Sequence, residues 1–104
     1  MSDACVVMTT VANAEQARII MTAVIEARLA ACAQVQSISS CYRWEGKVVN
    51  DAEHLILFKT RSSAYEALEA KLLALHPYDT PEIIRLPVDG GSARYLAWIA
   101  GEVG

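Results

Sequence analysis

Four segments of the chain are rich in apolar and β-branched residues and predict β-strands, at residues 5–10, 33–44, 47–60 and 82–88. Only Glu45-Gly46 separates the second strand from the third, and because glycine tolerates positive φ, the two predict a tight hairpin. Asn50-Asp51 interrupts the third strand and predicts a bulge or a break. Pro87 predicts that the fourth strand lies at a sheet edge or ends there, since proline cannot donate a backbone hydrogen bond.

Apolar residues recur every three or four positions between these strands, which predicts amphipathic helices. The first helix runs to about Leu29, and its apolar stripe consists of Ala17, Ile20, Met21 and Val24. The second helix covers residues 65–75, with a stripe of Tyr65, Leu68, Leu72 and Leu75. A last short helix carries Tyr95, Leu96, Trp98 and Ile99.

Residues before each helix predict where it begins. Asn13 with Gln16 resembles a capping box, in which a side-chain oxygen accepts from a free backbone amide three residues later. Ser63 with Glu66 predicts a second capping box, and Ser92 can cap the last helix. All three helix starts therefore have a predicted side-chain cap.

The order of elements is β-α-β-β-α-β, followed by a C-terminal helix, in a single domain over residues 1–104. Two right-handed crossovers in this order give an α+β, ferredoxin-like sandwich. At about 3.3 Å per residue, the central hairpin would reach roughly 40 Å. A domain of this size has a radius of gyration near ~13 Å, so the extended hairpin would overhang it. Because a two-stranded ribbon is marginal in water, the overhang predicts an oligomer.

The composition restricts the class of protein. A formal net charge of −3 gives no basic surface for nucleic acid. No apolar run reaches the roughly 20 residues of a membrane-spanning helix, so we expect no membrane partner. Three cysteines without paired spacing fit free thiols in a reducing cytoplasm, and the N-terminal residues resemble no secretion signal. A chain of 104 residues can bury a sufficient core without a metal or cofactor for folding.

The connection after the second helix reads His76-Pro77-Tyr78-Asp79-Thr80-Pro81-Glu82, a stiff turn that carries several polar groups. This turn resembles a motif of the CutA divalent-cation tolerance family. Four further segments resemble the family in the same order, namely 29–32, 42–47, 59–62 and 95–99. The resemblance implies a cytoplasmic homotrimer of ferredoxin-like subunits, similar in architecture to the PII signalling proteins.

Two residues are candidate metal ligands. His76 lies at a helix end, where we expect it to be exposed, and it could alternatively satisfy a last helical carbonyl. Cys41 is a soft donor suited to copper, although cysteine also packs as a small hydrophobic residue. We expect Cys5 and Cys32 to be buried, and His54 to be a solvated side chain opposite the apolar block of its strand.

The family resemblance implies a ligand-binding cleft between subunits, formed by Tyr42, Trp44, Lys59, Tyr78 and Glu82. Aromatic walls with a few convergent charges are the usual composition of a small-molecule site. The alternative for Lys59 and Glu82 is a structural ion pair. The sequence has no phosphate loop, nucleophile elbow or two-histidine metal helix, so we expect no enzyme.

Three functions therefore remain open. The resemblance favours a trimeric protein of tolerance or response to divalent metal ions, chiefly copper, by binding the metal or by signalling. The second is a PII-like module that binds a small anionic metabolite in the cleft. The third is a structural trimer that anchors another protein.

Overall fold

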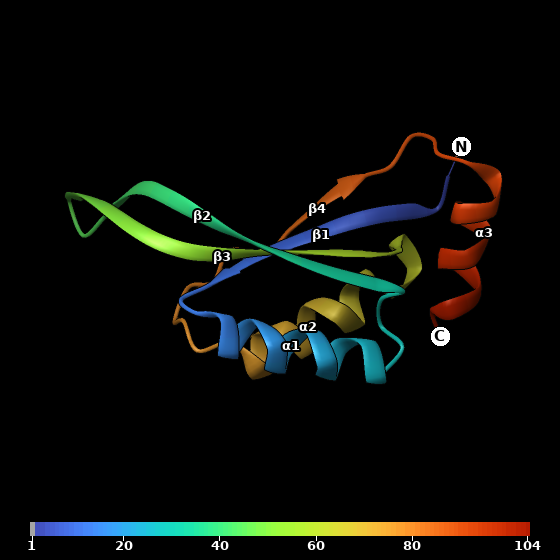
Figure 1. Ribbon diagram of the computed structural model, residues 1–104, viewed down its shortest axis with the longest axis horizontal. Helices are drawn as coiled ribbons and strands as arrows, with labels where there is room; N and C mark the ends of the chain where they lie inside the picture. Colours follow the sequence, from blue (N-terminus) through green and yellow to red (C-terminus); the bar gives the residue numbers. More distant parts are fainter. Residues whose placement is uncertain (1) are drawn as a thin grey trace.

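The computed structural model describes residues 2–104 (Figure 1). The strands are β1 Ala4–Val11, β2 Cys32–Trp44, β3 Lys47–Arg61 and β4 Ile84–Pro87. The helices are α1 Ala14–Glu26, α2 Tyr65–Leu75 and α3 Ala93–Glu102, with a 3-10 turn at Ser62–Ala64. This order confirms the predicted β-α-β-β-α-β arrangement and the C-terminal helix.

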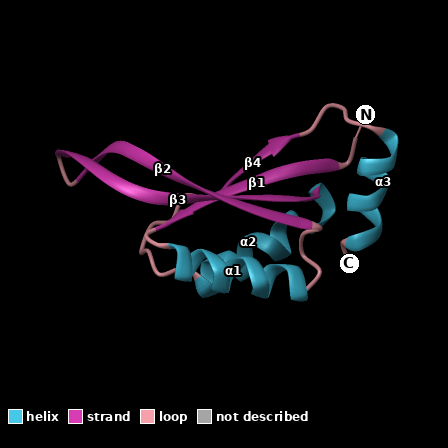
Figure 2. Ribbon diagram, in the orientation of Figure 1, coloured by secondary structure: helices cyan, strands magenta, loops and turns pink. Residues whose placement is uncertain are grey.

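The four strands form one antiparallel sheet in the order β2-β3-β1-β4. This strand order confirms the ferredoxin-like fold. Helices α1 and α2 lie together on one side of the sheet, and α3 lies near the end away from the hairpin tip (Figure 2). Strand β4 pairs only with β1 and ends at Pro87, so both predictions made from this proline are confirmed.

The core lies between the sheet and the two helices. Alternate residues of β3 point to the same face, and on the helix side Ile56, Phe58 and Thr60 are fully buried. Leu68 and Leu72 of α2 pack against this cluster from the predicted stripe. Burial of apolar area on this scale is the main stabilising contribution to a domain of this size.

The opposite face of the sheet, which we call the open face, carries exposed apolar residues. Ile84 and Leu86 of β4 are 45% and 47% exposed, although they pair with Met8 and Val6 at the centre of the sheet. Soluble monomers rarely leave a contiguous apolar surface uncovered. In one chain, the open face therefore leaves apolar side chains of β4 exposed to solvent.

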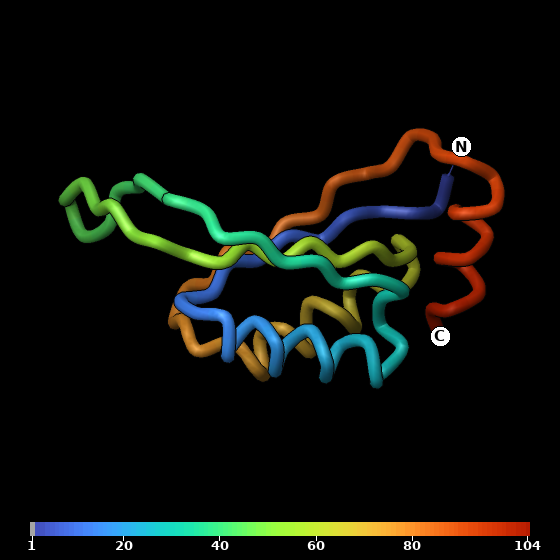
Figure 3. Tube along the Cα trace, in the orientation of Figure 1, coloured from blue at the N-terminus to red at the C-terminus, as the bar shows by residue number. Residues whose placement is uncertain are grey.

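The hairpin extends far beyond the rest of the sheet (Figure 3). Strand β1 pairs with β3 only as far as His54, so residues 38–53 form an isolated two-stranded ribbon. The molecule measures 44 × 25 × 22 Å as a result. The turn at Glu45-Gly46 has φ of 51° and 77°, as predicted for a tight reversal. The predicted bulge at Asn50-Asp51 is wrong, because both residues pair in continuous register.

Two of the three predicted caps are confirmed. The amide of Gln16 donates to Asn13 Oδ1 at 2.9 Å, and the amide of Tyr95 donates to Ser92 Oγ at 3.3 Å. The predicted Ser63 capping box is wrong. Because the chain enters α2 through a 3-10 turn, Ala64 occupies the cap position without a side-chain hydrogen bond.

Helix α1 ends at Glu26, three residues before the predicted end. Arg28 adopts a φ of 59°, which is incompatible with a continuing helix. Among residues 2–104, no helix combines the length and the apolarity needed to cross a membrane.

Candidate functional site

A cleft of about 800 Å³ lies where the base of the ribbon meets the 76–82 turn. Its walls include the aromatic side chains of Tyr42 and Trp44 from β2 and Tyr78 from the turn. Cys41 and Glu82 also line it. A single chain thus brings together five of the seven side chains that we predicted from the sequence.

Two tyrosine–carboxylate pairs shape the wall of this cleft. The hydroxyl of Tyr78 donates to Glu53 Oε2 at 3.0 Å, and the hydroxyl of Tyr42 donates to Asp51 Oδ2 at 2.5 Å. Burial, followed by the hydrogen bond to Glu53, raises the pKa of Tyr78 to about 12. The hydrogen bond to Asp51 raises the pKa of Tyr42 above its ordinary value. Both hydroxyls are therefore protonated donors near neutral pH.

The cleft is strongly acidic. Four carboxylates line it, from Asp51, Glu53, Asp79 and Glu82, and within the described part of the chain no lysine, arginine or histidine does. A cleft lined by charges of one sign concentrates ligands of the opposite sign. One chain alone therefore provides an electrostatic field that favours cations.

Asp51 and Glu53 line the cleft but are not among the site residues predicted from the sequence. The hairpin register could have revealed Asp51. This residue lies opposite Ser40, so it is a diagonal cross-strand neighbour of Tyr42 on the same face of the ribbon. Glu53 gave no local signal, since its partner Tyr78 is 25 residues away.

Lys59 lies outside the cleft of its own chain. It pairs with Cys32 at the base of the hairpin, and its ammonium donates to Gln34 Oε1 at 2.7 Å. The ammonium also lies 5.7 Å from the ring centroid of Tyr95 in α3. The ion pairs of the described chain are Arg18–Glu15 and Arg61–Asp3, so Lys59 and Glu82 form no ion pair within one subunit.

His76 is half-buried rather than exposed, which corrects the predicted environment. The amide of Tyr78 donates to Nδ1 at 3.1 Å, so Nδ1 carries no proton. Nε2 therefore carries the proton and donates to the carbonyl of Thr10 at 2.9 Å. Burial lowers the pKa of His76, which also favours the neutral ring. Since both nitrogens are engaged, a metal ion could bind His76 only after one hydrogen bond breaks.

The cysteines differ in environment. Cys41 is exposed, Cys5 is buried as predicted, and Cys32 is only half-buried. Burial raises the pKa of the Cys5 thiol, which disfavours a reactive thiolate there. Within residues 2–104, no three side chains of histidine, cysteine, aspartate or glutamate lie close enough to hold one metal ion.

The predicted environment of His54 is wrong. This residue lies on the same face of β3 as Ile56 and Phe58, facing the core, and it is half-buried. Its Nε2 is 3.5 Å from Ser37 Oγ, while its buried Nδ1 has no hydrogen-bond partner. Residues two apart in a strand point to the same face, so His54 lies beside Ile56 of the apolar block rather than opposite it.

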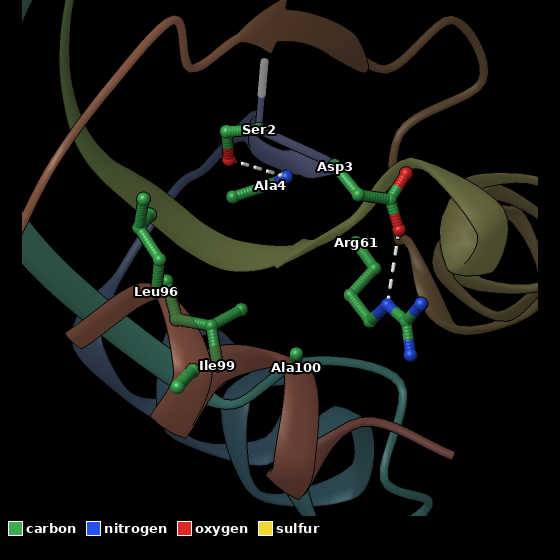
Figure 4. A pocket seen from close by; sticks show the side chains of 8 residues that line it. Ser2, Asp3, Ala4, Arg61, Leu96, Ile99 and Ala100 are labelled. Atoms are coloured by element: carbon green, nitrogen blue, oxygen red, sulfur yellow. Dashed lines mark hydrogen bonds and ion pairs between the residues drawn. The ribbon is translucent and has the colours of Figure 1, made fainter. Parts of the chain in front are cut away.

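A smaller pocket of about 280 Å³ lies between β1 and α3 (Figure 4). Figure 4 shows the guanidinium of Arg61 directed at Asp3, with Nε 3.0 Å from Oδ2. Leu96 and Ile99 of α3 form an apolar wall. This pocket contains none of the predicted site residues, and its ion pair joins the end of β3 to the start of β1.

Comparison with known proteins identifies the family. The family described as "CutA1 divalent ion tolerance protein" matches residues 5–102. A "Divalent-cation tolerance protein CutA" from Thermus thermophilus is 46% identical over 100 residues, which cover 95% of this chain and 97% of that protein. "Protein CutA, chloroplastic" from Arabidopsis thaliana is 45% identical over 90% of this chain, which spans only 52% of that longer protein.

Solved structures agree with these sequence matches. The crystal structure of CutA from Xylella fastidiosa superposes with a TM-score of 0.95 at 36% identity, covering 99% of this chain and 100% of that chain. The Thermus thermophilus protein gives a TM-score of 0.93 at 44% identity, covering 97% and 99% of the two chains. The chain therefore belongs to the CutA1 divalent ion tolerance protein family.

Proposed function

We propose that this family member acts as a cytoplasmic homotrimer in tolerance of divalent cations, chiefly copper, without catalysing a reaction. The acidic cleft is the observation that carries the proposal, because its carboxylates attract cations and its lining, among residues 2–104, includes no lysine, arginine or histidine. Three free cysteines fit a reducing compartment, and this supports the cytoplasmic location.

Two features of the sheet support self-association. Strands β2 and β4 form its edges, and in one chain their outer hydrogen-bonding groups have no partner strand. Val48 at 63% and Trp44 at 48% are exposed on the ribbon, in addition to the apolar residues of β4. Pairing and burial between subunits would stabilise both edges. We propose threefold symmetry because the family resemblance implies a trimer similar to the PII proteins.

His76 and Cys41 are the proposed metal ligands. The neutral imidazole of His76 has the protonation state that a metal ligand needs at Nδ1, where the amide of Tyr78 now donates. An exposed thiol at Cys41 supplies a soft donor for copper. Metal binding would thus compete with the hydrogen bond that holds the turn.

Copper titration tests this assignment. We expect about one copper ion per subunit in the unmodified protein, and loss of that binding in His76→Ala because a principal ligand is removed. Isothermal titration with Cu²⁺ and with Cu⁺ measures both. His54→Ala is the matched control, since His54 lies on the core side of the sheet, and it should bind copper normally. Undiminished binding in His76→Ala/Cys41→Ser would contradict the ligand assignment.

A second candidate function is a PII-like module that binds a small molecule in a cleft between subunits. The size and aromatic walls of the cleft favour it, because small-molecule sites range over about 300–1,000 Å³. An anionic metabolite would need a cation from a neighbouring subunit, and Lys59 is the residue that we expected to contribute one.

A further inference from the structure

The 76–82 turn is fastened to the chain through side chains. Among the residues that the structure describes, residues 77–82 make no backbone-to-backbone hydrogen bond. Two hydrogen bonds hold the turn instead, and Tyr78 donates both. Its amide donates to His76 Nδ1 at 3.1 Å, and its hydroxyl donates to Glu53 Oε2 at 3.0 Å. Segments with few hydrogen bonds and few buried contacts are those that open locally at low cost. The turn can therefore open while the sheet and helices stay folded, and Tyr78 keeps it closed.

The closed turn leaves His76 without a free ligand position. Its Nε2 carries the proton and donates to the carbonyl of Thr10 at 2.9 Å, with Thr9 Oγ1 3.1 Å away. The remaining lone pair, on Nδ1, accepts from the Tyr78 amide, and the two ring centroids are 4.9 Å apart. A neutral imidazole binds a metal ion through its unprotonated nitrogen. Nδ1 therefore becomes available only when Tyr78 moves away.

The hydrogen bond to Glu53 makes this movement unfavourable. Glu53 lies on β3 with only 9% of its surface exposed, so the bond joins the Tyr78 hydroxyl to a shielded carboxylate. Hydrogen bonds to charged groups stabilise more than neutral ones do, and exclusion of water strengthens them. Loss of one such bond typically shifts an equilibrium by at least about tenfold. The Tyr78 hydroxyl therefore keeps the open turn a minor state.

We propose that the 76–82 turn is a latch on His76, closed by the Tyr78–Glu53 hydrogen bond and opened when Tyr78 leaves Glu53. The proposal deepens the proposed function and rests on His76 as a ligand there, because a metal ion would reach the imidazole only through the open turn. Since only open molecules can bind, the latch lowers the apparent affinity for the metal in proportion to the fraction of molecules that are open.

Chemical modification of His76 tests the latch without a metal. Diethyl pyrocarbonate acylates the unprotonated nitrogen of a neutral histidine, and peptide mass spectrometry of the full-length protein gives the rate at each site. The chain has two histidines, so His54 serves as an internal reference. Tyr78→Phe keeps the ring and removes the hydroxyl. We expect it to accelerate modification of His76 by at least about tenfold and to leave the rate at His54 unchanged.

Tyr42→Phe is the matched control. It removes the hydroxyl of the other tyrosine–carboxylate pair of the cleft, which donates to Asp51 and does not hold the turn. The rate at His76 should therefore stay at the value of the unmodified protein. An unchanged rate in Tyr78→Phe overturns the latch and indicates that another part of the assembly covers His76. Equal acceleration in Tyr42→Phe overturns it too, because the whole cleft would then have loosened.

Isothermal titration of the same proteins with Cu²⁺ separates the latch from the proposed function. The latch predicts that Tyr78→Phe binds copper more tightly, by the same factor as the increase in modification rate, because both measure the open fraction. Equal copper affinity in the unmodified protein and Tyr78→Phe overturns the latch and retains the metal function. Faster modification in Tyr78→Phe, without copper binding in either protein, supports the latch and contradicts the proposed function.

Discussion

Leu86→Asp should convert the assembled protein into monomers at micromolar concentration. Leu86 is 47% exposed on the open face, in the edge strand β4 beside Val6 of β1. If the open face is the subunit contact, the variant buries an unpaired carboxylate at each of three symmetry-related positions. Removing the partner of a buried charge costs about 3–5 kcal/mol, and an unpaired aspartate in a contact should cost a similar amount. Sedimentation velocity should show the loss of the assembled species.

The control is Leu73→Asp. Leu73 is 55% exposed on α2, in the helix layer on the other side of the sheet, so a charge there should leave association unchanged. Circular dichroism checks that both variants keep the fold. An assembled Leu86→Asp protein would show that another surface joins the subunits.

Thermal unfolding of the unmodified protein should depend on its concentration, since association and folding are linked. For a trimer that unfolds to three separate chains, the unfolding equilibrium depends on the square of the chain concentration. A tenfold dilution therefore lowers the free energy of unfolding by about 2.7 kcal/mol per trimer. With typical unfolding entropies for three chains of this length, the midpoint should fall by about 4 °C. Scanning calorimetry at two concentrations tenfold apart measures the shift.

The physical reason lies in the ribbon. Residues 38–53 have no third strand in their own chain, and an isolated two-stranded ribbon is marginally stable in water. The monomeric Leu86→Asp variant should unfold at a midpoint that dilution does not change. An unmodified protein whose midpoint is also independent of concentration would contradict a subunit-stabilised ribbon.

Most of the fold could be predicted from the sequence because periodicity and turn chemistry agree with the tertiary structure. The stripe of Ala17, Ile20 and Val24 is buried as its spacing predicts, and the turn at Gly46 adopts positive φ. The bulge or break predicted at Asn50-Asp51 is wrong. Cross-strand pairing with β2 holds both residues in register despite their low strand propensity.

The candidate site could be predicted only in part. Tyr42 and Trp44 share a strand face, and Tyr78 and Glu82 share one stiff turn, so local spacing already groups each pair. The buried partner Glu53 depends on how the turn folds back over β3, which no local pattern reveals. Lys59 was grouped with these residues by family resemblance, and the register places it at the other end of β3.

Native mass spectrometry of the purified protein, with and without added copper, tests the central claim most directly. The proposed function predicts a species of three 11.3 kDa chains that gains about one copper ion per chain. A single 11.3 kDa chain that stays free of copper would contradict both the trimer and its part in handling divalent cations.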